Sequence, residues 1–402
     1  MRDESKCLKV PRADGSFASL SIPVHRASTI VFDSVDAYRN RRGAMYDGYS
    51  YGLYGTPTTR TLEHALAALE GAPRALVLPS GFAAIALTTL TFCAVGQRVL
   101  FPDTAYDTVR PFADRLLGRL GIKPVFYDPM IGGGIADLLD SSVQLVWVES
   151  PGSMTLEVQD VPAITAACRA RGILTAADNT YATPLRCKPI ALGVDISICA
   201  ASKYISGHSD VVMGSIAVKD EGVFRQLKDH TRFLGQGVSA DEASLVLRGM
   251  ETMAIRLDRC EQTAMSLLPL FGASEAVREV RHPALPSNPG HEFWKRDFTG
   301  AGGLITLFLE PWTRPVLDGA IEAMEQFAIG ASWGGTKSVV AVLDQPPLRS
   351  AMPSPHDGPI VRLSIGMEHP DDLTESLQRC LEILSSGRAA VKTDESIRKG
   401  LV

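Results

Sequence analysis

The residues best suited to chemistry in this chain are a lysine and an aspartate that each follow an apolar segment. Asp178 comes directly after the apolar run 173–177, and Lys203 stands shortly after a second run, 196–200. Both runs have the length and composition of buried parallel strands. Because the carboxyl ends of the strands in an open α/β sheet form its ligand crevice, we expect the amine and the carboxylate to lie close together. The alternative is that both are ordinary loop residues, since Lys and Asp are common at surfaces.

An amine and a carboxylate in one crevice suit pyridoxal phosphate. This cofactor needs a lysine for its Schiff base and a carboxylate that keeps its pyridine nitrogen protonated, so that the ring can accept electrons. The turn Ser80-Gly81-Phe82 adds an anion site, because backbone N–H groups at a helix start bind phosphate and glycine permits close approach. Ser80 is also a good helix N-cap, and the two roles can coexist.

The elements that would position these residues follow from alternating strand and helix patterns. Strands are expected at 74–78, 98–101, 124–127, 144–149, 173–177, 196–200 and 215–218, and again at 277–281, 303–309 and 361–365. Such alternation predicts an α/β fold with a mainly parallel sheet and helices on both faces. A helical pattern from Ser239 to about Leu270 is expected to bridge two domains, the proline-rich segment 346–359 to be a loop, and residues 385–402 to be a loose tail.

We therefore predict three parts: an N-terminal arm (1–60), a cofactor-binding domain (61–245) and a smaller C-terminal α/β domain (246–402). The 402 residues carry a net charge of −5 with both signs interspersed, which argues against a nucleic-acid surface. No apolar stretch is long enough to span a bilayer, and the N-terminus lacks a signal peptide's apolar core, so a cytoplasmic protein is expected. The 7 cysteines are scattered, which predicts reduced thiols and no metal site.

Six segments together resemble the Cys/Met-metabolism family of fold-type I pyridoxal phosphate enzymes, and within it the bacterial cystathionine β-lyases. They are 149–153, 178–184, 202–204, 290–300, 332–335 and 362–366. The segments occur in the family's order, and the resemblance runs from about Ile22 to Leu384. Each segment alone would be a weak signal, but the combination is specific. It implies the fold-type I architecture, with a seven-stranded sheet domain and a smaller C-terminal domain, and pyridoxal 5'-phosphate as the cofactor.

The resemblance also implies a role for each matched residue. Lys203 would hold the cofactor and act as the base at Cα, Asp178 would pair with the pyridine nitrogen, and Tyr106 would stack on the ring. The phosphate would be bound by Gly81, Phe82 and Ser202, with Tyr51 reaching into a neighbouring subunit of a homodimer or homotetramer. The substrate would be bound by Arg362, whose guanidinium suits an α-carboxylate, and by Trp333, Ser332 and Ser153. For Tyr106 and Arg362, packing or solvation are the ordinary alternatives.

The implied reaction is α,β-elimination of L-cystathionine, or a related cysteine S-conjugate, to pyruvate, ammonia and a thiol such as homocysteine, within methionine biosynthesis. Alternatives are γ-elimination or γ-replacement, as in methionine γ-lyase or cystathionine γ-synthase, and a non-catalytic relative that keeps the fold. Two positions depart from the family's pattern. Leu53 replaces the arginine of Tyr-x-Arg in the arm, with Arg60 a candidate substitute, and Ala331 replaces a tyrosine before Ser-Trp-Gly-Gly. The second change predicts a smaller, less polar pocket.

Overall fold

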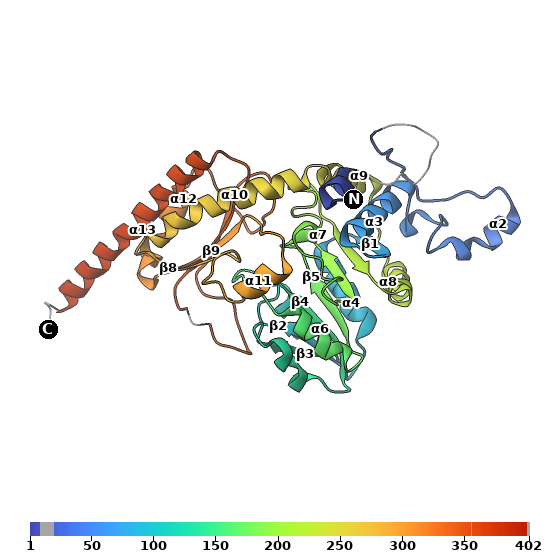
Figure 1. Ribbon diagram of the computed structural model, residues 1–402, viewed down its shortest axis with the longest axis horizontal. Helices are drawn as coiled ribbons and strands as arrows, with labels where there is room; N and C mark the ends of the chain where they lie inside the picture. Colours follow the sequence, from blue (N-terminus) through green and yellow to red (C-terminus); the bar gives the residue numbers. More distant parts are fainter. Residues whose placement is uncertain (9–19, 355, 400–402) are drawn as a thin grey trace.

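The computed structural model of the protein describes residues 1–8, 20–354 and 356–399, and its main strands form two sheets (Figure 1). The larger sheet has seven strands in the order β1-β7-β6-β5-β4-β2-β3. Its strands are β1 (Arg74–Leu78), β2 (Arg98–Pro102), β3 (Lys123–Tyr127), β4 (Val143–Glu149), β5 (Leu174–Asp178), β6 (Ile196–Cys199) and β7 (Gly214–Val218). The pairs that involve β7 are antiparallel and the others are parallel. The predicted mainly parallel α/β sheet is therefore confirmed.

Different helices cover the two faces of this sheet, because successive strand side chains point to opposite sides. On one face α4 (Gly81–Phe92) and α8 (Glu221–Phe233) pack in a core that includes Phe101 and Trp147. On the other face α3 (Pro57–Glu70), α6 (Val161–Arg169) and α9 (Ala240–Met250) bury their apolar sides. The remaining short elements of this part are α5 (Val109–Pro111), η3 (Phe112–Leu117), η4 (Gly132–Leu138) and α7 (Thr183–Arg186).

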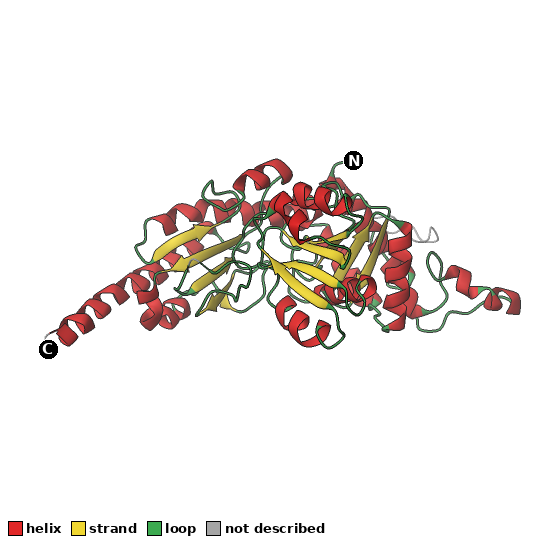
Figure 2. Ribbon diagram, turned by 90° about the horizontal axis from the view of Figure 1, so that it is seen from below, coloured by secondary structure: helices red, strands yellow, loops and turns green. Residues whose placement is uncertain are grey.

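The smaller sheet has five strands in the order β10-β11-β12-β9-β8, and it lies beside the larger one (Figure 2). Its strands are β8 (Val277–Arg281), β9 (Leu304–Leu309), β10 (Ala328–Ile329), β11 (Val339–Leu343) and β12 (Ile360–Ser364). The helical elements near it are α10 (Met253–Gly272), α11 (His291–Asp297), η5 (Pro311–Val316), α12 (Leu317–Glu322) and α13 (Pro370–Lys399). Leucines of α10 and α13 share one apolar core with the strands, so this part has its own hydrophobic centre.

The single helix expected from Ser239 to about Leu270 is two helices, α9 and α10, separated at Glu251 and Thr252. Gly249 lies against the backbone of Ser206, where an added Cβ would meet the Ser206 oxygen at 2.2 Å. The Arg256 guanidinium donates to the Gly249 carbonyl oxygen at 2.7 Å. Because that carbonyl is satisfied by a side chain, α9 can end there without an unpaired buried acceptor.

The C-terminal segment is also not the loose tail that its polarity indicated. Helix α13 continues through residue 399, while residues 400–402 lie outside the described part of the chain. Leu373, Leu377 and Leu384 anchor the first half of the helix in the core of the smaller sheet. Once that half is nucleated by packing, good helix formers such as Ala, Lys and Glu propagate it.

The N-terminal region carries α1 (Asp3–Leu8), α2 (Val35–Arg39), η1 (Arg41–Ala44) and η2 (Gly52–Tyr54). Residues 20–55 extend away from the two sheets, on the side opposite the end of α13 (Figure 1). Large apolar side chains in this arm are exposed, including Leu20 at 101% and Val31 at 88%. None of the described helices is both long and apolar enough to cross a membrane.

Candidate active site

Asp178 and Lys203 line the same cavity of about 220 Å³ at the carboxyl ends of the strands. Asp178 is the last residue of β5, and Lys203 follows β6, its parallel neighbour, in which Ile198 pairs with Asp178. The cavity is also lined by Gly81, Phe82, Tyr106, Ser153, Ser202, Trp333 and Arg362. The structure thus brings together sequence-predicted residues from both sheets. Among the described residues no group of His, Cys, Asp and Glu is arranged to hold a metal ion.

The Lys203 amine has a lowered pKa, so it loses its proton more readily than an exposed lysine does. Burial and the nearby Arg362 charge lower the pKa of Lys203 to about 8, against the opposing effect of Asp178. Its Nζ donates to the Ser332 hydroxyl at 2.7 Å and lies 5.3 Å from the centre of the Trp333 ring. A lysine with a lowered pKa can serve as a nucleophile toward a carbonyl carbon and as a base near neutral pH.

Asp178 is a partly buried carboxyl group at the end of β5. Burial raises the pKa of Asp178, although the Thr180 backbone N–H donates to its Oδ1 at 2.9 Å. A carboxylate in such a place is stabilised by an added positive charge, because it has been removed from water. A protonated pyridine nitrogen would supply that charge.

Glu149 is a site residue that the sequence analysis did not single out, although it opens the matched segment 149–153. It ends β4 and pairs in register with Asp178 on β5. Its Oε2 accepts the Tyr106 backbone N–H at 2.7 Å. Burial, together with the Asp178 charge, raises the pKa of Glu149 well above its usual range, against the backbone hydrogen bonds of Tyr106 and Ser153. Two carboxyl groups on neighbouring strands therefore line the cavity.

Tyr106 stands at the open side of the cavity, with its side chain 43% exposed. Its ring centre lies 6.4 Å from that of Phe82, which comes from the start of α4. Glu149 holds the Tyr106 backbone, so the ring is presented from a fixed main chain. This position suits a ring that stacks on a flat cofactor.

The start of α4 provides the candidate phosphate site. The Ser80 hydroxyl caps the helix by accepting the Ala83 N–H at 3.0 Å, and the first N–H groups of a helix have no acceptor within it. An added Cβ at Gly81 would lie 2.5 Å from the Ala200 Cβ, so only glycine lets α4 begin this close to the end of β6. Ser202 lines the same cavity as Ser80 and Gly81.

Arg362 is a buried guanidinium with an unused donor. It belongs to β12, is 7% exposed, and donates through Nη2 to the Ala331 oxygen at 2.6 Å. Its Nη1 contacts the Met154 sulfur at 3.3 Å, and its buried Nε has no partner. An unsatisfied buried donor is costly, and a substrate carboxylate would satisfy it.

The loop that follows β4 also lines the cavity, with Ser153 and Met154 among its lining residues. The Ser153 N–H donates to the Thr104 oxygen at 2.8 Å. Met154 and Leu156 have φ values of 64° and 58°, in the left-handed region that residues other than glycine seldom occupy. Such backbone is retained only where its surroundings hold it, as they do here between the two sheets.

The arm residues lie elsewhere. Tyr51 is 44% exposed, packs against Tyr54 at 5.7 Å and does not line the cavity of its own chain. Leu53 packs within its own chain, since an added Cβ at Gly237 would meet its Cδ1 at 2.7 Å. Arg60 is buried and donates to Glu63 at 2.9 Å, so it is already committed to an internal ion pair. The arginine missing from the arm is therefore not replaced by a free Arg60.

These observations fit pyridoxal phosphate. The start of α4 and Ser202 would hold its phosphate, Lys203 would attach it covalently, and Asp178 would pair with its ring nitrogen. Arg362, whose Nε has no partner, lines the same cavity and would take the substrate carboxylate. The donor set thus accounts for the cofactor and for an amino acid together.

Comparisons with known proteins agree with this geometry. A model of the family described as "Cys/Met metabolism PLP-dependent enzyme" matches residues 4–382. A cystathionine β-lyase of Escherichia coli is 37% identical over 361 residues, 88% of this chain and 91% of that protein. An L-alanine/L-glutamate racemase of Wolbachia pipientis is 36% identical over 394 residues, 95% and 97% of the two chains. A cystathionine γ-synthase structure from Xanthomonas oryzae has a TM-score of 0.86 at 28% identity, covering 96% and 99%.

Proposed function

The chain belongs to the Cys/Met metabolism PLP-dependent enzyme family, and we propose that it is a carbon–sulfur β-lyase. Its cofactor is pyridoxal 5'-phosphate. The proposed reaction is the cleavage of L-cystathionine, or of a related cysteine S-conjugate, to pyruvate, ammonia and a thiol such as homocysteine. The fold-type I architecture, with the second sheet beside the first, agrees with the solved relatives, whose TM-scores reach 0.87.

The observation that carries the proposal is that Lys203 and the unsatisfied guanidinium of Arg362 line one cavity. When bound, the cofactor supplies an electron sink for the carbanion at the substrate Cα. Arg362 holds the α-carboxylate and so determines which Cα bond faces Lys203. The Lys203 amine, with a pKa of about 8, takes the Cα proton. The Cβ–S bond then breaks with its electron pair on sulfur, and the unsaturated product hydrolyses to pyruvate and ammonia.

The alternative within the family is γ-elimination or γ-replacement. That route needs a second deprotonation, at Cβ, and therefore a base placed for it. Lys203 is the only lysine that lines the described cavity, and β-elimination needs only one proton removed from carbon. The identity to the E. coli β-lyase, 37% over 361 residues, supports the same choice.

The deciding experiment supplies L-cystathionine to the holoenzyme and identifies the keto acid. Pyruvate and homocysteine are expected. Lactate dehydrogenase detects pyruvate continuously, and chromatography separates it from 2-oxobutyrate, which that coupling enzyme can also reduce. Mainly 2-oxobutyrate with cysteine would reject the β-lyase and favour the γ-route. The same assay on the Lys203→Ala variant is the blank.

Amino-acid racemisation is a second candidate, favoured by the match to the Wolbachia racemase over 95% of this chain. Removal of the Cα proton is the first step of both reactions. Where Cβ carries no leaving group, as in alanine, return of the proton to the opposite face inverts the centre. Chiral chromatography of L-alanine incubated with the enzyme tests this directly. D-Alanine formed faster than pyruvate is released from cystathionine would place racemisation first.

We also propose that the protein acts as a homodimer or homotetramer in the cytoplasm. The support is the arm, whose apolar side chains are exposed and whose Tyr51 lies outside the cavity of its own chain. Burial of such a surface against a second copy is favourable. Mixed Lys203→Ala and Tyr51→Phe subunits test it: recovered activity after subunit exchange would place Tyr51 in a neighbour's site.

We also propose that the chain divides into three parts, with boundaries at residues 60 and 245.

A further inference from the structure

A second cavity, of about 630 Å³, adjoins the candidate active site. The two cavities share the walls formed by Tyr106, Ser153, Met154 and Arg362. Ala331, the residue that departs from the family's tyrosine, lines the second cavity only. If Arg362 and Lys203 hold the Cα end of a substrate, as the proposed function requires, the adjoining second cavity can receive the substituent on sulfur. We refer to this space as the distal cavity.

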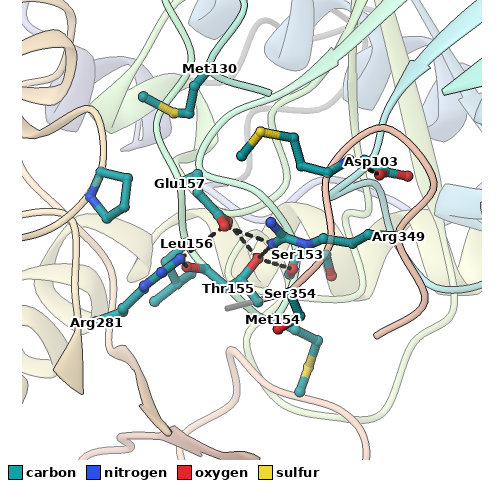
Figure 3. Close-up of polar contacts among 12 residues, drawn as sticks. Asp103, Met130, Ser153, Met154, Thr155, Leu156, Glu157, Arg281, Arg349 and Ser354 are labelled. Atoms are coloured by element: carbon teal, nitrogen blue, oxygen red, sulfur yellow. Dashed lines mark hydrogen bonds and ion pairs between the residues drawn. The ribbon is translucent and has the colours of Figure 1, made fainter. Parts of the chain in front are cut away.

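Residues 346–352, which follow β11, form a roof over the distal cavity, where Pro347, Leu348 and Arg349 line it. We refer to this segment as the roof loop. Arg349 anchors it, as Figure 3 shows: Nη2 donates to Glu157 Oε1 and to the Thr155 hydroxyl, both at 2.7 Å. Arg281 of β8 donates to the same Glu157 oxygen at 2.8 Å. One carboxylate thus joins the roof loop, the smaller sheet and the loop after β4.

The three charged side chains of this anchor are nearly buried, with exposed fractions of 5% for Glu157, 7% for Arg281 and 8% for Arg349. Burial disfavours the ionised form of Glu157, but the charges of Arg349 and Arg281 outweigh this and lower its pKa. A buried ion pair of this kind keeps a fixed geometry. If its members separated, each charge would remain without solvation by water.

Asp103 provides the second anchor. Its side chain is fully buried, and its Oδ2 accepts the backbone N–H groups of Ser350 at 2.7 Å and Ala351 at 2.6 Å. Its Oδ1 accepts from Arg110. Asp103 begins the turn that ends in Tyr106, and Thr155 follows Met154 directly. Both anchors of the roof loop are therefore attached to the walls that the two cavities share.

We propose that the roof loop closes a leaving-group subsite, and that its anchors at Arg349 and Asp103 determine which thiols the enzyme can release. The proposal rests on the β-lyase function. The walls offer apolar contacts from Phe126 and Leu343 for a methylene chain, and the rim carries Asp107 and Arg115, with both signs of charge. A thiol that ends in an amino-acid group matches this lining. A methyl substituent would leave most of the distal cavity unfilled.

The test compares two substrates that differ only beyond sulfur, L-cystathionine and S-methyl-L-cysteine. In the Arg349→Ala variant we expect kcat/KM for cystathionine to fall about ten-fold more than for S-methyl-L-cysteine, the scale of a lost subsite contact. Arg349→Lys keeps the positive charge but offers fewer donor directions. Its loss in kcat/KM for cystathionine should lie between those of the wild type and Arg349→Ala. Arg278→Ala is the matched control, because Arg278 forms an exposed ion pair with Asp357, which lies between the roof loop and β12.

Leu348→Trp covers the case in which the Arg349 variants fold poorly. Leu348 is 73% exposed, so a larger side chain is tolerated there, and it should narrow the cavity. Cystathionine should again lose more than S-methyl-L-cysteine. Equal losses for both substrates in the folded variants would overturn the roof loop's role while leaving the lyase intact. Release of pyruvate from neither substrate by the wild-type enzyme would overturn the β-lyase proposal, and the subsite with it.

Discussion

Buried or partly buried carboxyl groups occupy two neighbouring regions of this protein, and their surroundings are opposite. In the active site, Glu149 and Asp178 lie side by side, and burial raises the pKa of both. In the anchor of the roof loop, Glu157 lies between Arg281 and Arg349, whose charges lower its pKa despite burial. Glu149 and Asp178 form no ion pair with an Arg or Lys side chain among the described residues. Glu157 forms ion pairs with both Arg281 and Arg349. Where the protein's own arginines pair with a carboxylate, the ion pairs stabilise the structure. Where they do not, we expect a bound ligand to supply the positive charge.

The largest effect is expected in the uncompensated region. Lys203→Ala should lower turnover by about 10³-fold or more, because no other lysine lines the cavity. Borohydride reduction followed by peptide mass spectrometry should find the pyridoxyl group on the Lys203 peptide of the wild type. Lys219→Ala, at an exposed lysine, is the control. A pyridoxyl group on another lysine would refute the assignment.

The compensated region should respond in stability instead. Glu157→Ala leaves two buried guanidinium groups without their shared partner and should lower the free energy of unfolding by about 3–5 kcal/mol. Chemical denaturation measures this. Glu325→Ala, which removes an exposed pair with Arg379, should change stability little. If both variants behave alike, the anchor does not hold the two sheets together.

The pKa of Lys203 gives a prediction about pH. Below a pKa of about 8 the amine is mostly protonated, so its rate of reaction with free pyridoxal phosphate should rise about ten-fold per pH unit and level off above 8. Absorbance of the recombining apoprotein follows the rate without any substrate. A profile that keeps rising to pH 10 would mean that burial and Arg362 do not lower this pKa.

The smallest effect on activity is expected from Glu149→Gln, and the direction of its effect on stability distinguishes the two regions. The amide keeps one oxygen to accept the Tyr106 N–H and removes a carboxyl group whose pKa burial raises. Stability of the apoprotein should therefore be kept or slightly raised, while kcat falls about ten-fold or less, because an amide oxygen holds the Tyr106 N–H less strongly than a carboxylate oxygen does. Visible circular dichroism of the bound cofactor reports on that position. A clear loss of stability, like that of Glu157→Ala, would erase the difference between the two regions.

The free energy of unfolding should depend on pH in opposite directions for the carboxyl groups of the two regions. A raised carboxyl pKa in the folded state, as for Asp178, means that the folded protein binds more protons, so this contribution weakens as pH rises above the unfolded value near 3.8. A lowered pKa, as for Glu157, contributes stability above the unfolded value near 4.5 and loses it as pH falls through the folded pKa.

Much of the fold and of the cavity could be predicted from the sequence. Short apolar runs indicated the strands of the larger sheet, and Asp178 and Lys203 were placed in one crevice because parallel strands end at one edge. The break between α9 and α10 could not be predicted, because it depends on Gly249 lying against Ser206, which is distant in sequence. The continuation of α13 depended likewise on leucines that pack against the smaller sheet.

The sequence by itself determined the residue types that can do chemistry, the strand ends that carry them and the family to which the chain belongs. These are local properties, set by apolar periodicity and by the order of short segments. Only the tertiary structure decided that Glu149 lies beside Asp178, that Arg60 is committed to Glu63, and that Asp103 and Glu157 hold the roof loop. Those outcomes depend on which distant charges meet in a place without water. There, the energy of a charge is set by its neighbours in space and not by its neighbours in the chain.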